Sequence, residues 1–132
     1  MFKLDPQLKK DTFFIKDLKL CQVLLMNNSL YPWVILVPKK ADLVEIIDLS
    51  EADQILLMEE IALVSKALQR HLKPKKLNVA NLGNMVSQLH IHIIARFEND
   101  PAFPKPVWGQ ESKLYLDDEL KKIIEWMGEE IK

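Results

Sequence analysis

The chain has 132 residues, 48% of them hydrophobic, which suffices for one hydrophobic core but leaves little room for a second independent domain. Lys and Arg total 18 against 19 Asp and Glu, so the protein lacks the basic excess that holds nucleic acid by its phosphates. We therefore expect a single domain over residues 1–132 and no specific nucleic-acid partner.

The cysteine content and the N-terminal residues predict the compartment. The only cysteine, Cys21, has no partner for a disulfide within the chain, which is typical of a reducing environment. Residues 1–10 carry charges rather than the apolar stretch of a signal peptide, and no apolar run reaches the roughly 18 residues of a membrane span. We expect a cytoplasmic protein that does not contact a membrane.

The N-terminal half predicts one short helix and several strands. Asp5 suits a helix cap and Pro6 the first helical position, while aromatic, Val and Leu residues predominate in the stretches that follow. The expected elements are a helical turn over 5–10, two strands or one bent strand over 13–16 and 19–26 with an interruption at 16–17, a turn at 27–29, and a hairpin strand over 33–37.

The second half predicts two helices and a pair of strands. Ser50 begins the clearest helix, because Asp53 follows three residues later and apolar residues then recur at helical spacing until the helix ends near Leu72. The further elements are strands over 76–82 and 88–96 joined at 83–84, a proline-rich segment over 101–108, and a helix from 117 with the apolar stripe Leu120, Ile123, Ile124, Met127 and Ile131. This order predicts an α+β domain whose mostly antiparallel sheet packs with one long helix and a C-terminal helix.

Two of the three histidines lie in the stretch of residues 88–94, where polar and apolar residues alternate. In a strand the aliphatic residues would enter the core, and Gln88, His90 and His92 would share the other face. Alternate residues lie about 6.6 Å apart along a strand, so two imidazoles can address one bound phosphate. A neutral ring nitrogen can attack phosphorus and form a covalent phosphoramidate. One interpretation is therefore a nucleophile with an assisting neighbour.

Two other interpretations of the histidine pair stay open. Histidines on the open face of a half-buried strand can simply be tolerated surface residues. The pair can also offer two ligands to a metal ion, but zinc needs a third protein ligand. Cys21, in an apolar run, and His71, at the end of the long helix, are poor candidates for that ligand, so we expect no metal site.

The stretch of residues 83–96, GNMVSQLHIHIIAR, resembles the signature of the histidine triad (HIT) family, in which Gly-Gln-x-Val-x leads into His-x-His-x-His and two apolar residues. The preceding segments follow in the family's order, so the resemblance covers about residues 14–96 and leaves 97–132 as a C-terminal extension. It implies a HIT-like fold, a nucleotide substrate and a homodimer. It implies no required cofactor, and a divalent metal would enter only as the counterion of the substrate.

The resemblance also implies a role for each matching residue. His90 matches the nucleophile that takes up the nucleoside monophosphate, and His92 matches the last histidine of the triad, which contacts the phosphate and helps the departing group. The implied nucleotide-binding residues are Asn27, against the ribose, and Asn81, Gly83 and Asn84, on the phosphate side.

Two positions depart from the family's pattern. Gln88 occupies the first triad position, and Trp33 stands in place of a further histidine that many members carry. The carbonyl of Gln88 can still accept a hydrogen bond from His90 and leave the attacking nitrogen bare. The losses affect protonation of the leaving group, because Gln cannot change charge and Trp offers only a donor nitrogen. Two functions follow: a hydrolase or nucleotidyl transferase acting on nucleoside polyphosphates or phosphoramidates, or a non-catalytic nucleotide-binding module.

Two tryptophans near the C-terminus have a structural and a functional interpretation. Trp108 could cover a base as an aromatic lid, or the prolines before it could form a stiff connection that packs it into the body or against a partner subunit. We favour packing for Trp108, and also for Trp126, which lies close to the apolar stripe of the last helix.

Overall fold

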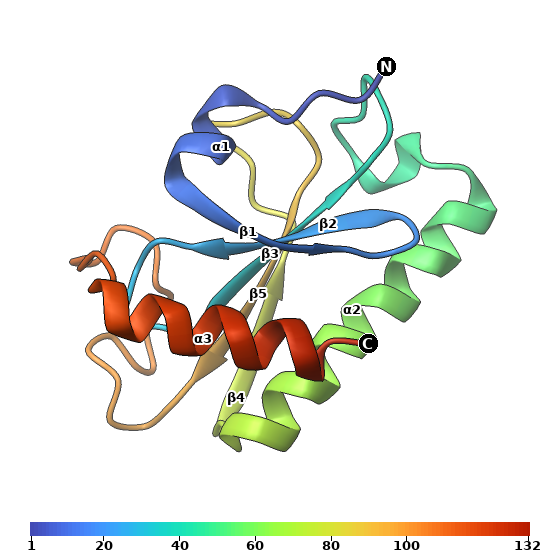
Figure 1. The fold of residues 1–132 in the computed structure, drawn as a ribbon. Coiled ribbons are helices and arrows are strands. Elements are labelled where there is room, and N and C mark those ends of the chain that lie inside the picture. Colours follow the sequence, from blue (N-terminus) through green and yellow to red (C-terminus); the bar gives the residue numbers. More distant parts are fainter.

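A computed structural model describes residues 1–132 as one five-stranded sheet with three α-helices (Figure 1). In chain order the elements are α1 (Pro6–Asp11), β1 (Thr12–Asp17), β2 (Cys21–Met26), β3 (Trp33–Pro38), the 3-10 turn η1 (Ile46–Asp48), α2 (Glu51–Leu72), β4 (Lys76–Ala80), β5 (Ile91–Arg96) and α3 (Asp117–Glu130). The strands lie in the order β1-β2-β3-β5-β4, and all neighbours are antiparallel. This architecture confirms the predicted α+β fold.

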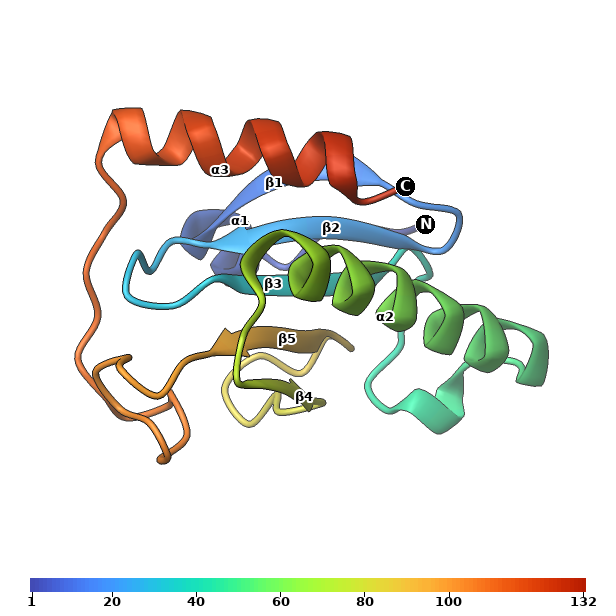
Figure 2. The ribbon, with the colours of Figure 1, turned by 90° about the horizontal axis from the view of Figure 1, so that it is seen from below.

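Different segments cover the two faces of the sheet. α1 and the N-terminus lie on one side, and α2 and α3 lie across the other (Figures 1 and 2). In β3, Val34 and Leu36 belong to the core beneath α2 and α3, whereas Ile35 and Val37 belong to the cluster on the α1 side. Because β3 is buried on both faces, its sequence is a continuous apolar run without alternation.

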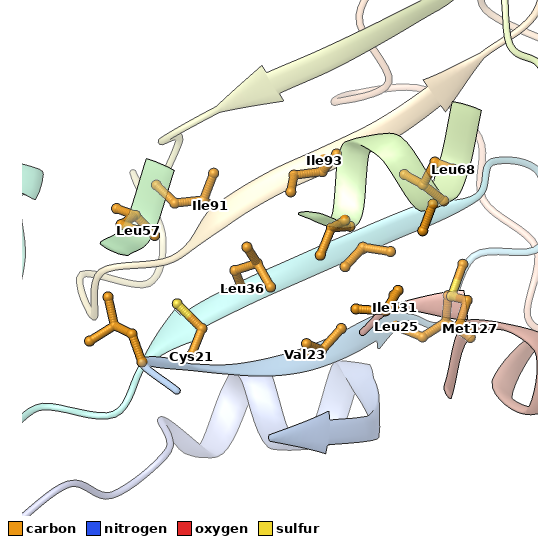
Figure 3. Close-up of a cluster of buried hydrophobic side chains, with 14 of the residues drawn as sticks. Cys21, Val23, Leu25, Leu36, Leu57, Leu68, Ile91, Ile93, Met127 and Ile131 are labelled. Carbon is orange, nitrogen blue, oxygen red and sulfur yellow. The ribbon is translucent and has the colours of Figure 1, made fainter. Parts of the chain in front are cut away.

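The larger core lies between the sheet and the helices α2 and α3 (Figure 3). Met127 and Ile131 close it at α3, which confirms the predicted apolar stripe of the last helix. Cys21 is fully buried there, and burial raises the pKa of its thiol, so it is a packing residue. Trp126 stacks on His71 at the end of α2 with ring centroids 4.0 Å apart, which confirms its packing role.

The helices begin and end where local signals predict. The Ser50 side chain accepts a hydrogen bond from the amide of Asp53, and α2 ends at Leu72, followed by Lys73 in the left-handed conformation (φ 52°). α3 begins at Asp117, and three acidic residues occupy its first turn. None of the helices combines the length and the apolar composition that a membrane crossing would need.

The predicted strand boundaries need three corrections. β1 and β2 are two strands, and the interruption lies at residues 18–20 rather than 16–17. β4 ends at Ala80, so residues 81–90 form a longer connection than the predicted turn. β5 begins at Ile91 rather than Gln88, because residues 88–90 do not yet pair with a neighbouring strand. The amide of Leu89 donates instead to the carbonyl of Leu43.

A buried glutamate joins the long helix to the first hairpin. Glu60 is 4% exposed, and its carboxylate accepts hydrogen bonds from the backbone amides of Leu20 and Cys21 at 2.8 and 2.9 Å. These bonds offset the cost of burying a charge. The sequence did not indicate this contact, since a helical glutamate is ordinarily a surface residue.

Candidate active site

His90 and His92 lie together on the face of the sheet opposite α2 and α3. Their ring centroids are 4.9 Å apart, and the neighbouring Ile91 and Ile93 point into the core on the other face, as predicted. Each histidine is only 4% exposed. The interpretation of the pair as tolerated surface residues is therefore wrong, because the α1 side of the sheet is covered as well.

A backbone carbonyl fixes the tautomer of His90. Its Nδ1 lies 2.6 Å from the carbonyl oxygen of Gln88. A carbonyl can only accept, so Nδ1 carries the proton and the Nε2 lone pair is bare. Nε2 makes no hydrogen bond within the protein, yet the only buried side-chain polar atoms without a partner are Gln22 Oε1 and Tyr31 OH. The bare nitrogen therefore keeps contact with solvent.

The ring of His92 is held at both nitrogens. Trp33 Nε1 donates to His92 Nδ1 at 3.0 Å, and His92 Nε2 donates to the carbonyl of Leu82 at 2.9 Å. This pattern fixes the tautomer opposite to that of His90. Burial lowers the pKa of His92 to about 4, against the effect of the Leu82 hydrogen bond. The phosphate contact predicted for His92 would require one of its two hydrogen bonds to break.

The side chain of Gln88 points away from the histidines and fastens the N-terminal segment. Its Oε1 accepts from the amide of Asp5 at 2.8 Å, and its Nε2 donates to the carbonyl of Lys3 at 2.9 Å. Gln88 therefore touches His90 only through its backbone. The sequence could not indicate these contacts, because the partners lie 83 and 85 positions away along the chain.

Gly83 allows the connection before β5 to pass close to His90. A Cβ atom at this position would lie 2.7 Å from the carbonyl oxygen of Val86 and 3.2 Å from His90 Cε1. The first distance is shorter than any ordinary contact, and the atom it meets belongs to the backbone. A side chain at position 83 would thus collide with the backbone of the same connection and press on the ring of His90, so close approach requires glycine here.

The predicted nucleotide-binding residues line two separate cavities. Asn27, Trp33 and Trp108 lie on a cavity of about 520 Å³. The side-chain oxygen of Asn27 accepts from the amide of Tyr115 at 3.0 Å, while its NH₂ group has no partner in the protein. A smaller cavity of about 120 Å³ is lined by residues that include Asn81, Gly83, Asn84 and Gln88.

The histidine pair lies between these two cavities without lining either of them. The ring of His92 packs against Trp33, whose other neighbour is Trp108, and the ring of His90 packs against Gly83. The structure thus brings the two histidines together and divides the predicted binding residues between two flanking cavities.

Trp108 packs against the site, as we favoured from the sequence. Its ring lies edge-on to Trp33 and His92, with centroids 5.8 and 5.1 Å away, and it is half-buried. The segment that carries it is anchored by Arg96, whose guanidinium pairs with Asp100 at 2.9 Å in the interior. Although burial alone would raise it, the hydrogen bonds from Arg96 and three backbone amides lower the pKa of Asp100 to about 2.

The candidate metal ligands do not come together. Cys21 belongs to the core on the α2 side of the sheet, and His71 stacks on Trp126 at the end of α2. Nowhere do three His, Cys, Asp or Glu side chains form a group that could hold a metal ion. The histidine pair thus has no third ligand of the kind that zinc needs.

Comparison with known proteins identifies the family. Residues 7–99 match the family model described as the HIT domain. The chain belongs to the HIT domain family. The match begins earlier than residue 14, where the sequence resemblance placed it, and extends slightly past Arg96. Membership in the HIT family supports a nucleotide-binding or hydrolase-type function, and members generally act on phosphorus.

Three solved HIT structures are similar over nearly the whole chain. A histidine triad protein from Bradyrhizobium japonicum is 46% identical, with a TM-score of 0.97 and coverage of 99% of this chain and 98% of that chain. One from Sinorhizobium meliloti is 41% identical (TM-score 0.94, coverage 98% and 96%), and one from Marinobacter aquaeolei is 39% identical (TM-score 0.95, coverage 100% and 99%). The similarity to these three proteins therefore extends over the segment of residues 97–132 as well. No match was found among curated proteins.

The buried neutral state of His92 predicts a pH-dependent loss of stability in this HIT protein. The unfolded chain binds a proton near pH 6.5 and the folded protein only near pH 4. The contribution of neutral His92 to the free energy of unfolding is therefore complete above pH 6.5. It is lost as the pH falls to 4, with a total on the order of 3 kcal/mol. Urea unfolding of the wild type and of His92→Gln between pH 7 and pH 4 measures it, and the difference between their unfolding free energies should shrink.

The ion pair between Asp100 and Arg96 does not interfere with that measurement. The stability that Asp100 contributes to the fold is lost only as the pH falls from 3.8 to about 2. Parallel stability curves for the wild type and His92→Gln down to pH 4 would contradict the buried neutral state of His92.

Gly83→Ala tests the close approach at His90. The added Cβ forces either the backbone at Val86 or the ring of His90 to move. A misplaced reacting group can cost about 100-fold in rate, so we expect kcat/KM for nucleotide cleavage to fall by about that factor. Gly128→Ala is the matched control, because nothing lies within 4 Å of its Cβ position in α3. Equal activity of the two variants would show that the approach does not matter.

Proposed function

We propose that this HIT protein is a nucleotide hydrolase or nucleotidyl transferase that acts on a nucleoside polyphosphate or phosphoramidate through a nucleotidyl-histidine. The tautomer of His90 carries the proposal, because the Gln88 carbonyl holds the proton on Nδ1 and leaves the Nε2 lone pair bare. Such a bare nitrogen of a neutral imidazole is a nucleophile.

The proposed reaction has two steps at one phosphorus atom. In the first, His90 Nε2 forms a bond to phosphorus while the bond to the departing group breaks, and the departing group takes the electron pair. The nucleotidyl-imidazolium keeps its proton on Nδ1, which continues to donate to the carbonyl oxygen of Gln88. In the second step water attacks phosphorus, the P–N bond returns its electron pair to Nε2, and one water proton passes to solvent. An acceptor hydroxyl in place of water would make the same chemistry a transfer.

The two flanking cavities supply the proposed nucleotide contacts. Asn27 lines the larger cavity and its NH₂ group has no partner in the protein, so we expect this group to meet a ribose oxygen there. Asn81, Gly83 and Asn84 lie together on the smaller cavity beside His90, where polar side chains and backbone can meet phosphate oxygens. This division assigns the nucleoside to one side of the histidine pair and phosphates to the other.

A second candidate is a non-catalytic or very slow nucleotide-binding module. The burial of His90 favours it, because a ring that is 4% exposed and lines neither flanking cavity leaves a phosphorus atom little room to approach. The ring of His92 also favours the non-catalytic module, since both of its nitrogens are hydrogen-bonded and neither is free for a ligand. Such a module would bind nucleotide without forming a covalent intermediate.

His90→Ala separates the two candidates. For the enzyme, we expect the variant to lose turnover of a dinucleoside polyphosphate and of adenosine phosphoramidate by at least 1,000-fold, an order of magnitude typical of removing a nucleophile. Brief incubation followed by mass spectrometry should find nucleotidyl-His90 in the wild type only. His71→Ala is the matched control, because His71 lies outside the site against Trp126.

The module would instead show nucleotide binding by calorimetry with neither turnover nor a modified histidine. Wild-type turnover that persists unchanged in His90→Ala would remove His90 from the mechanism altogether. The proposal also keeps two expectations from the family resemblance, a homodimer and activity without a cofactor, with any divalent metal bound only to the substrate. It keeps as well the cytoplasmic location expected from the cysteine content and the N-terminal residues.

A further inference from the structure

We propose that this site cleaves nucleotides whose departing group leaves as a stable anion, such as the phosphate of an anhydride, and discriminates against amine leaving groups because His92, Trp33 and Gln88 are all engaged in hydrogen bonds and none is free to protonate them. The inference rests on the proposed His90 mechanism and narrows its substrate class from polyphosphates and phosphoramidates to anhydrides. It follows from where each potential proton donor of the site is engaged.

The second imidazole is not available as an acid. His92 donates its only proton to the Leu82 carbonyl, and its other nitrogen accepts from Trp33. Delivering the Nε2 proton to a leaving group would break the bond to Leu82, and adding a proton at Nδ1 would set it against the Trp33 N–H. Burial of the ring further disfavours the charged imidazolium.

The two positions that depart from the family pattern cannot replace it. Gln88 carries a neutral amide, and both ends of that amide are bound to the backbone of Lys3 and Asp5. The Trp33 indole has a single N–H, which it gives to His92. Neither side chain loses a proton at neutral pH, so neither can act as a general acid.

Charged groups of both signs lie around the flanking cavities. Lys10 and Asp11 lie on the Asn27 cavity, and Lys3, Asp5 and Asp42 lie on a third cavity of about 610 Å³ that shares Gln88 with the small one. The ammonium groups of Lys10 and Lys3 can stabilise a departing phosphate by charge without proton transfer. The acidic residue on the small cavity is Glu45, and an ionised carboxylate accepts hydrogen bonds rather than donating them.

The nature of the broken bond then decides the rate. When the P–O bond of an anhydride breaks, the electron pair goes to a phosphate oxygen that is stable as an anion, so no proton is required. When a P–N bond breaks, the nitrogen must receive a proton because an amide anion is far too basic to leave. A positioned general acid is worth about 100- to 10,000-fold, and substrates that need one should be slower by that range.

A graded series of leaving groups tests the inference. Aryl esters of adenosine 5′-monophosphate, from nitrophenol to unsubstituted phenol, change the basicity of the departing oxygen while the nucleoside stays constant. We expect kcat/KM, which reports on the first step, to fall steeply along the series, by at least 100-fold in total. A dinucleoside polyphosphate should exceed adenosine phosphoramidate by a similar factor.

Two substitutions at one position supply the matched comparison. Gln88→His adds a side chain that can donate a proton, whereas Gln88→Asn loses the contacts to Lys3 and Asp5 without adding one. Both keep the backbone carbonyl that holds His90. We expect both variants to leave the steep dependence unchanged, because the side chain at position 88 points away from the histidines and toward Lys3 and Asp5.

The outcomes separate this inference from the proposed function. A shallow dependence in the wild type, or phosphoramidate cleavage as fast as anhydride cleavage, overturns the inference while the His90 mechanism stands. The absence of turnover on every substrate, with no nucleotidyl-histidine trapped, overturns the proposed function and this inference with it. The wild-type series decides the matter even if a Gln88 variant does not fold.

Discussion

The backbone carbonyl of Gln88 decides which nitrogen of His90 carries a proton, and the chemistry of the site depends on that choice. The carbonyl faces the ring because the chain has not yet joined β5 at this point. The amide of Leu89 donates to Leu43, and the Gln88 side chain binds the N-terminal segment. Close packing at Gly83 then restricts where the ring can lie. A backbone acceptor retains this function when the side chain of the position changes, so the identity of the residue at position 88 does not by itself alter the tautomer of His90.

The two imidazoles are placed side by side but are held in opposite states. His90 has one bound and one bare nitrogen, whereas His92 has partners at both. The difference comes from the sheet register, because β3 pairs Trp33 with Ile94 and so sets the indole within reach of the ring two residues earlier on β5. A tryptophan in this position supplies a fixed donor, and His92 becomes a neutral supporting group. The site therefore offers one nitrogen with a free lone pair, and the neighbouring side chains of His92 and Trp33 do not readily donate a proton to a ligand.

Much of the fold could be predicted because its signals are local. The Ser50 cap, the spacing of apolar residues in α2 and the acidic start of α3 each lie within a few residues of the feature they determine. The beginning of β5 could not be predicted, since the alternation of polar and apolar residues continues through Gln88 although the backbone has already turned away to Leu43. Alternation shows which face a side chain occupies, but hydrogen bonding to the neighbouring strand decides where the strand begins.

The candidate site divides in the same way. The proximity of His90 and His92 followed from their spacing on one strand face, and the family resemblance added the acceptor at Gln88. Their burial and the Trp33 and Leu82 hydrogen bonds did not follow, because Trp33 lies 59 positions from His92 and meets it only through the sheet register. Likewise, Asn27 lies apart from Asn84 because it directly follows β2, whereas Asn84 precedes β5, and β3 lies between these two strands.

Nitrogen-15 NMR of the histidine side chains at neutral pH tests the central claim most directly, since the two neutral tautomers have different long-range couplings from ring protons to nitrogen. The account predicts that His90 carries its proton on Nδ1 and His92 on Nε2, so the two neighbouring rings give opposite patterns in one spectrum. A spectrum in which His90 carries its proton on Nε2 would contradict the account, because the attacking nitrogen would then have no lone pair to offer.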